Sequence, residues 1–268
     1  MHKEGNPGRP IISDNGSPTE IISKFVDFHI QDLVKHHHHT SKTTWTVFAK
    51  SMISTRLVSS LQVHFSLCTM DACALYTNIP HAEGITACRE AMIKWREHIT
   101  KPSARFLCNL IQHILTLNFL QFEDNLWLQT HGTAMGTSMA PSYANLFMGA
   151  LEGKMLNSSP HQPLIWLRYL DDIYLIWTHG SSTLDQFLAH AKNFHPTIQF
   201  TSEISPLKIP FLGVMITLQG GRLETDPYTP FRAADWKHTH TLNLQTLSII
   251  YIGVHVTLTT LNAAYHTA

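Results

Sequence analysis

The strongest constraint on the fold is a pair of adjacent aspartates between two short apolar runs, WLRYL and IYLIW. Asp171 and Asp172 stand where the two runs meet. Apolar runs of this length are typical of buried strands, so the segment predicts a β-hairpin with an acidic tip. Strands are depleted in Asp and neighbouring carboxylates repel each other, so a buried acidic tip is costly unless a cation neutralises it. A solvated turn is the alternative, because Asp also favours turns.

A third carboxylate follows another apolar run, FSLCTM. The run predicts a strand that ends at Asp71. Carboxylate oxygens suit Mg²⁺, which keeps water and substrate phosphates in its coordination shell. Three carboxylates can hold two such ions about 4 Å apart. We therefore expect a site for two divalent ions where Asp71 meets Asp171 and Asp172 across the sheet.

The rest of the chain contains both helical and extended patterns. Ser17, Pro18 and Glu20 form a capping box that predicts a helix start, and helical spacing continues to Leu33. The other predicted helices are His81–His98, Ser103–Leu117, Ser142–Leu156 and Thr183–Phe194. The other predicted strands and hairpins are Phe119–Gln129, Thr197–Glu203, and Pro210–Leu218 followed by Gly220–Thr225. This order predicts an α+β fold, with an antiparallel sheet and helices on one of its faces.

Composition limits the class of protein. The 268 residues are 44% hydrophobic and 14% charged, which is typical of a folded globular chain. We expect no membrane helix, because the most apolar stretch, Leu244–Leu261, is interrupted by polar residues. The first residues carry no secretory signal pattern. The four cysteines show no C-x-x-C pairing, which argues against a zinc site.

The charge balance argues against a strong grip on nucleic acid. Lys and Arg together number 19, as do Asp and Glu, so the chain has no net charge with neutral histidine. Surfaces that bind nucleic acid usually neutralise phosphates with an excess of Lys and Arg.

Five segments surround or follow the aspartates in a characteristic order. They are TMDACALYTNIPHAEGI, QTHGTAMGTSMAPSYANLFMGALE, RYLDDIYLIW, FHPTIQFTSEIS and IPFLGVMI. Together they resemble the reverse transcriptases of Penelope-like retroelements, a group related to telomerase. The first and third resemble the two catalytic motifs, the second the motif that positions template and substrate, and the last two the later palm motifs with the primer grip. The resemblance covers Gly5–Lys35 and Phe65–Thr229.

The resemblance implies a right-hand polymerase palm, an antiparallel sheet flanked by helices, with partial fingers and no intact thumb. It implies RNA-directed DNA polymerisation by two-metal nucleotidyl transfer. Asp71, Asp171 and Asp172 would be the catalytic residues and the ligands of two Mg²⁺ ions, or of Mn²⁺ in their place. The partners would be an RNA template, a DNA primer and deoxynucleoside triphosphates, without a membrane. A nuclear location is expected from the family, and the oligomeric state is left open.

Four further positions carry roles in binding the nucleotide and template by this resemblance. Tyr76 falls where the class places its steric gate, whose ring would collide with a ribose 2′-hydroxyl; a core tyrosine is the alternative. Gly136, with Thr137 and Pro141, would let the backbone approach the nucleotide and template. Met135 stands where many relatives have Gln, as expected for the Penelope-like branch.

Two basic residues complete the substrate-binding set. Arg9 resembles the fingers arginine that binds the triphosphate, although an exposed loop arginine is the alternative. Lys208 is a candidate proton donor to the leaving pyrophosphate.

Two segments depart from the family, about His36–Gln62 and about Ala233–Ala268. One permitted back-translation of His36–Arg56, shifted by one base, begins Thr-Pro-Pro-Ser-Tyr and resembles what the family carries there. A similar shift of Ile249–Ala268 resembles the segment beyond the primer grip. We hypothesise compensated frameshifts near residue 35 and an uncompensated one near residue 232. Sequencing the gene tests this, and the hypothesis fails if neither shifted frame encodes such residues.

The expected organisation follows from these departures. Residues 1–64 would be a fingers remnant with a disrupted linker, 65–230 the reverse transcriptase palm, and 231–268 a poorly ordered tail outside the family pattern. Two functions stay open at this point. One is an RNA-directed DNA polymerase, with activity degraded by the losses. The other is a catalytically inactive palm relic that binds nucleic acid or another protein.

Overall fold

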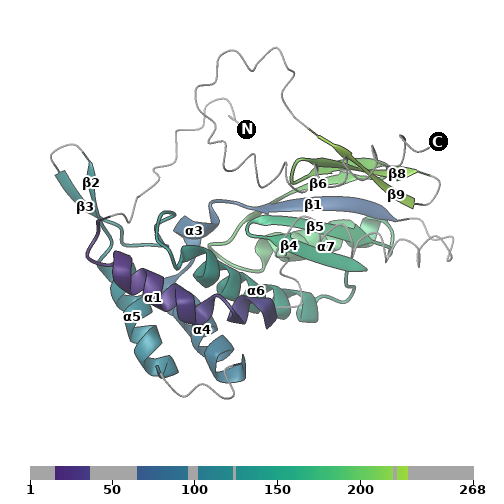
Figure 1. The fold of residues 1–268 in the computed structure, drawn as a ribbon. Coiled ribbons are helices and arrows are strands. Elements are labelled where there is room, and N and C mark those ends of the chain that lie inside the picture. The colour runs from purple at the N-terminus through teal and green to yellow at the C-terminus, as the bar shows by residue number, and fades with distance from the viewer. Residues whose placement is uncertain (1–15, 37–64, 96–101, 123–124, 220–221, 229–268) are drawn as a thin grey trace, which may run out of the picture.

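The computed structural model describes residues 16–36, 65–95, 102–122, 125–219 and 222–228 (Figure 1). The helices of this part are α1 (Glu20–Ile30), the 3₁₀ helix η1 (Leu33–His36), α3 (Leu75–Asn78), α4 (His81–Trp95), α5 (Ala104–Thr116), α6 (Ala140–Ser158) and α7 (Ser181–Asn193). The strands are β1 (Ser66–Ala72), β2 (Phe119–Phe122), β3 (Asn125–Leu128), β4 (Ile165–Tyr169), β5 (Asp172–Trp177), β6 (Phe200–Ser205), β7 (Lys208–Phe211), β8 (Val214–Gln219) and β9 (Arg222–Pro227). The predicted α+β class is confirmed.

The central sheet has four strands in the order β4-β5-β1-β6. Every neighbouring pair in it is antiparallel. The two apolar runs around the aspartates form the β4–β5 hairpin, as predicted. The run that ends at Asp71 forms β1, which lies between β5 and β6 and so occupies the middle of the sheet.

The two faces of this sheet bury different sets of side chains, because successive residues of a strand point to opposite faces. Residues of one parity lie in a main core with the helices, and those of the other parity lie in a second core. The main-core residues of β1 and β5 are Cys68, Met70, Ala72, Ile173, Leu175 and Trp177. The second-core residues of β1, β4 and β5 are Leu67, Ile165, Leu167, Tyr174 and Ile176. Continuous apolar runs are therefore required, since both faces are covered along much of the sheet.

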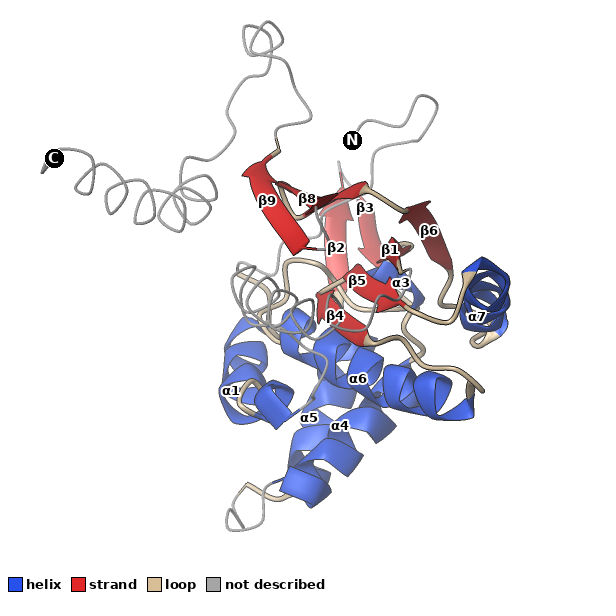
Figure 2. Ribbon diagram, turned by 90° about the vertical axis from the view of Figure 1, so that its right-hand side faces the viewer, coloured by secondary structure: helices blue, strands red, loops and turns tan. Residues whose placement is uncertain are grey.

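The helices gather on the main-core side of the sheet. Figure 2 shows α1, α4, α5 and α6 together on one side of the strands, with α7 beside β6. Helix α1 contributes Val26 and Ile30 to the same buried cluster as Leu146 of α6. Helix α1 is thus packed into the core of the sheet domain. The predicted boundary at residue 64 lies outside the described residues.

The opposite face is covered at one end by a second sheet, β7-β8-β9. Ile209, Phe211, Ile216 and Leu223 of this sheet pack against the second-core residues of the central sheet. The predicted hairpin is confirmed as the antiparallel pair β8–β9. Its first strand was predicted as one run, Pro210–Leu218, and that part of the prediction is wrong. Leu212 and Gly213 both have positive φ, 49° and 76°, and their turn divides the apolar run into β7 and β8.

Of two predicted helix caps, one is wrong and one is confirmed. Helix α1 begins at Glu20 with Thr19 as its N-cap and no side-chain cap, so the predicted Ser17 cap is wrong. The Glu20 carboxylate instead accepts a hydrogen bond from the Gly16 N–H at 2.7 Å. The predicted cap of α5 is confirmed, because Ser103 Oγ accepts from the Phe106 N–H at 3.2 Å.

Several predictions fall on residues that the structure does not describe. These include the non-family segment of about His36–Gln62, apart from His36 itself, the tail 231–268 and the proposed frameshift near residue 232. Within the described ranges, no helix has the length and apolar character needed to cross a membrane.

A close contact between α4 and α6 fixes how the helix layer packs. A Cβ atom at Gly84 of α4 would overlap the hydroxyl of Tyr143 on α6, and Tyr143 is fully buried. Glycine at this position therefore lets the tyrosine ring lie directly against the backbone of α4.

We predict that Gly84→Ala lowers the free energy of unfolding by about 2 kcal/mol, since overpacking a buried contact forces the backbone apart. Gly153→Ala in α6 is the matched control, because no atom lies within 4 Å of its added Cβ. The control should raise stability by about 0.5 kcal/mol, as alanine favours the helix. Chemical denaturation measures both, and equal effects would contradict the packing argument.

Candidate functional site

The strand register brings the three aspartates to one end of the central sheet. Asp71 of β1 pairs directly with Asp172 of β5. Asp171 precedes Asp172 in the hairpin turn, and its carbonyl accepts a hydrogen bond from the Ala72 N–H at 3.0 Å. The two carboxylates that the sequence placed on separate strands are therefore cross-strand neighbours, with the third adjacent to them.

Asp71 and Asp172 also share a face. Asp71 has the parity of Leu67 and Asp172 that of Tyr174, so both project to the side of the sheet away from the helices. The β7–β9 sheet covers this face over Leu67, at the other end of β1. All three aspartates are partly exposed. The acidic end of the sheet is thus left accessible on one face.

The clustering changes the acidity of one member. Burial, and then the negative charges of Asp171 and Asp71, raise the pKa of the Asp172 carboxyl from 3.8 to about 6. All three causes act in the same direction, so the folded state disfavours the third negative charge at this end of the sheet. Carboxylate oxygens under mutual repulsion have the donor chemistry of a site for a hard divalent cation.

Tyr76 lies close enough to this cluster to be affected by it. It belongs to α3, which directly follows β1, and it packs partly buried against the edge of the main core. Burial, followed by the charge of Asp171, raises the pKa of its hydroxyl. The side chain is therefore both packed against the core and an electrostatic neighbour of Asp171.

The glycine-bearing loop before α6 docks against the turn that carries Tyr76. The Thr133 N–H donates to the Tyr76 carbonyl at 2.7 Å, and the Gly132 carbonyl contacts His81 Nε2 at 2.7 Å. Gly132 has φ +67°, and a Cβ there would lie 2.5 Å from the Thr77 Cα. Only glycine meets both requirements, so Gly132 positions the loop next to Tyr76.

The loop residues predicted to bind substrate lie further along. Thr137 is buried, and its N–H donates to the Ala134 carbonyl at 3.2 Å. Gly136 and Pro141 are exposed, Pro141 within the first turn of α6. The structure thus connects this loop to Tyr76 through Gly132 and Thr133, two residues to which sequence reasoning gave no role.

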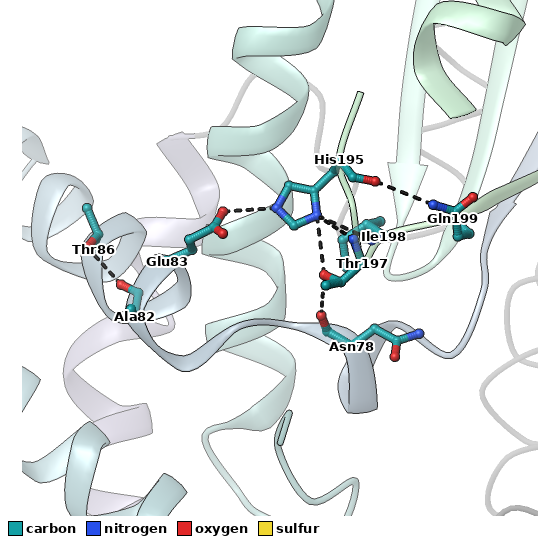
Figure 3. Close-up of polar contacts among 8 residues, drawn as sticks. All are labelled: Asn78, Ala82, Glu83, Thr86, His195, Thr197, Ile198 and Gln199. Carbon is teal, nitrogen blue, oxygen red and sulfur yellow. Dashed lines mark hydrogen bonds and ion pairs between the residues drawn. The ribbon is translucent and has the colours of Figure 1, made fainter. Parts of the chain in front are cut away.

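His195 lies behind a contact at the other end of α3, the turn that carries Tyr76 (Figure 3). Its Nδ1 accepts from the backbone N–H groups of Thr197 and Ile198, each at 3.3 Å. Because an amide N–H can only donate, the ring proton is on Nε2, which lies 2.9 Å from Glu83 Oε2 of α4. Thr197 Oγ1 then donates to the carbonyl of Asn78, the last residue of α3, at 2.7 Å.

Two predicted residues are not brought to the site. Arg9 lies outside the described residues. The Lys208 N–H donates to Ser205 Oγ at 3.1 Å, and Ser205 pairs with Leu67, at the end of β1 away from Asp71. Lys208 therefore begins its strand far from the aspartates, and its role as a proton donor stays a prediction.

Metal binding is likewise a prediction rather than a visible centre. In the described ranges, no group of three or more His, Cys, Asp or Glu side chains is already arranged as metal ligands. The aspartates are close by register, but their side chains would have to turn toward one point to share an ion.

The amino-acid sequence matches no protein-family model and no curated protein, whereas the fold is similar to solved structures. Apo telomerase from Candida tropicalis has a TM-score of 0.59 at 11% identity, over 80% of this chain and 40% of the telomerase. Telomerase from Candida albicans, with the TWJ fragment of telomeric RNA, gives 0.56 at 12%, over 84% and 40%. The BmCPV RNA-dependent RNA polymerase at its elongation state gives 0.54 at 12%, over 76% and 20%.

These similarities show a fold shared with template-dependent polymerases. At such low identity they show the fold alone. The chain spans less than half of the length of each of these relatives.

The raised pKa of Asp172 predicts how stability depends on pH. The carboxyl titrates near 3.8 when unfolded and near 6 when folded, so the folded state binds more protons between these values and the free energy of unfolding falls as pH rises from about 4 to about 6. Asp172→Asn should flatten this slope and raise stability at pH 7.5 by about 1 kcal/mol, allowing for solvent screening of a partly exposed group.

Asp185→Asn, on the exposed side of α7, is the matched control. Thermal denaturation from pH 4 to pH 8 measures all three proteins. A wild-type slope that persists unchanged in Asp172→Asn would show that the carboxyl is not strained by its neighbours.

Proposed function

We propose that this chain is the palm-containing part of an RNA-directed DNA polymerase of the kind that Penelope-like retroelements encode. The observation that supports this most is the cross-strand pairing of Asp71 with Asp172, with Asp171 beside them on an accessible end of the sheet. Structural aspartates alone would gain nothing from such mutual repulsion. In a reaction that uses divalent ions and phosphates, the ions would neutralise the clustered carboxylates, which explains why they lie together.

Nucleotidyl transfer assigns a role to each of these carboxylates. Asp71 and Asp172, facing the same side, would be the principal ligands of two Mg²⁺ ions, with Asp171 completing the set. When bound, two such ions lower the pKa of a primer 3′-hydroxyl and neutralise charge on the departing pyrophosphate. The new bond joins the 3′-oxygen to the α-phosphorus, and the bond to the pyrophosphate breaks.

The neighbouring loop and turn would select the nucleotide. Tyr76 lies near Asp171, and Gly132 and Thr133 hold the substrate loop against the backbone at Tyr76. A ring held in this way can exclude a ribose 2′-hydroxyl, which favours deoxynucleotides. The telomerase relative with bound RNA supports a nucleic-acid partner in general, and we propose an RNA template with a DNA primer.

A second candidate is a catalytically inactive relic of the same palm, which binds nucleic acid or another protein. The equal numbers of basic and acidic residues favour it, because they provide no excess charge for holding a duplex.

Primer extension on an RNA template with Mg²⁺ or Mn²⁺ separates the two candidates. Catalysis predicts incorporation by the wild-type chain that falls at least about a hundredfold in Asp171→Asn, the scale of loss when a charge-stabilising group is removed. Asp185→Asn should retain wild-type incorporation. No incorporation by a folded wild-type chain would refute the polymerase proposal.

The relic makes a separate prediction for the same proteins. Binding of a labelled RNA–DNA duplex should persist in EDTA and in Asp171→Asn. Binding that requires a divalent ion and is lost in Asp171→Asn would instead speak for the catalytic site.

A further inference from the structure

A buried arginine lies beneath the acidic hairpin, on the opposite face of the sheet from the aspartates. Arg168 of β4 and Glu152 of α6 both have side chains with no exposed surface. Arg168 Nε donates to Glu152 Oε1 at 2.8 Å, and Trp166 Nε1 donates to the same oxygen at 3.1 Å. Burying two charges is expensive, and a structural pair could be replaced by apolar residues with little loss. The position of Arg168 therefore needs a reason beyond the pairing itself.

The remaining contacts of the guanidinium supply that reason. Arg168 Nη1 donates to the Leu170 carbonyl at 3.0 Å, in the turn that leads to Asp171. The same nitrogen donates to Asn145 Oδ1 at 2.6 Å, and Nη2 donates to the Asn145 carbonyl at 3.3 Å. One planar group thus connects the hairpin turn to α6 at two positions, Asn145 and Glu152.

The turn needs such a support because of its backbone. Leu170 has φ +55°, in the left-handed region that a branched side chain rarely adopts. The next two residues are Asp171 and Asp172, so relaxation of Leu170 would rotate the peptide that leads into both carboxylates. A hydrogen bond from a fixed guanidinium to the Leu170 carbonyl opposes that rotation.

We propose that Arg168 is a positioning residue: by anchoring the strained Leu170 to α6, it fixes the backbone from which the Asp171 and Asp172 side chains turn toward a shared metal ion. This rests on the proposed function for its metal readout. The glycine-bearing loop that contains Gly136 and Thr137 leads directly into α6. The contact of Arg168 with α6 therefore also fixes the position of the aspartates relative to that loop. Lysine cannot replace the arginine, because a point charge lacks the fork that reaches Leu170, Asn145 and Glu152 together.

The test compares Mn²⁺ affinity among matched variants, from the loss of the free-ion electron paramagnetic resonance signal. The double variant Arg168→Met with Glu152→Met removes both charges, so it leaves no buried charge unpaired. We expect its Mn²⁺ dissociation constant to rise at least about tenfold, the effect typical of losing an outer-shell partner. Trp166→Phe is the control, since it loses a bond to Glu152 but keeps Arg168 on Leu170; it should bind within about twofold of wild type.

A rescue separates positioning from general damage to the fold. Asparagine adopts positive φ far more readily than leucine, so adding Leu170→Asn to the double variant should recover a large part of the lost affinity. Wild-type affinity in a cooperatively folded double variant would overturn the proposal, as would equal losses in the double variant and Trp166→Phe. If the double variant does not fold, Arg168→Lys takes its place. An Mn²⁺ affinity of Arg168→Lys equal to that of wild type would then overturn the proposal.

Failure of the proposed function gives a different result. In that case the wild-type chain itself leaves the Mn²⁺ signal unchanged. The positioning role is then read from amide hydrogen exchange at the hairpin tip. It predicts exchange at least about tenfold faster in the double variant than in wild type or Trp166→Phe, since the local opening of the turn becomes easier. Equal exchange in all three would overturn it.

Discussion

The antiparallel pairing of β1 with β5 determines both the core and the candidate site. Its register sorts alternate residues to two faces, so Cys68 and Met70 enter the helix-covered core while Leu67 enters the other. The same register sets Asp71 opposite Asp172. A slip of one residue would exchange the faces of the whole strand, placing polar side chains in the core and Asp71 among the helices. Packing thus opposes a one-residue slip, which would also separate Asp71 from the face it shares with Asp172.

Much of this arrangement could be predicted from local sequence. Apolar runs around Asp171 and Asp172 predict a hairpin, and Ser103 predicts the start of α5, because strand periodicity and helix caps act over a few residues. The sequence also led us to expect Asp71 beside the hairpin, and the β1–β5 register, which pairs Asp71 with Asp172, supports this. Tyr76 was placed near the site by motif alone, and its electrostatic coupling to Asp171 agrees with that position.

The features that sequence missed depend on contacts between distant segments. Gly132 is required because the backbone at Thr77, more than fifty residues earlier, lies against it. A contact between segments so far apart leaves no pattern in the local sequence. The Ser17 cap was wrong because α1 begins at Glu20 with Thr19 as its N-cap, and the Glu20 carboxylate accepts from the Gly16 N–H. Arg168 stood within an apolar run as a visible anomaly, yet its partners Glu152 and Asn145 become evident only when α6 packs against β4. Charged residues inside strands therefore merit a search for partners on the covering helix.

The place of β1 in the sheet also governs when the fold can form. Both of its neighbours, β5 and β6, come about a hundred residues or more later in the chain, so the pairings that complete the sheet are strongly non-local. During synthesis β1 cannot pair in the sheet until β5 has left the ribosome. Until then its apolar side chains are exposed and both of its edges lack a partner strand. Helices α4 and α5 can form meanwhile from local contacts. We expect slow folding, a dependence on chaperones at this stage, and aggregation of any product that stops before Trp177.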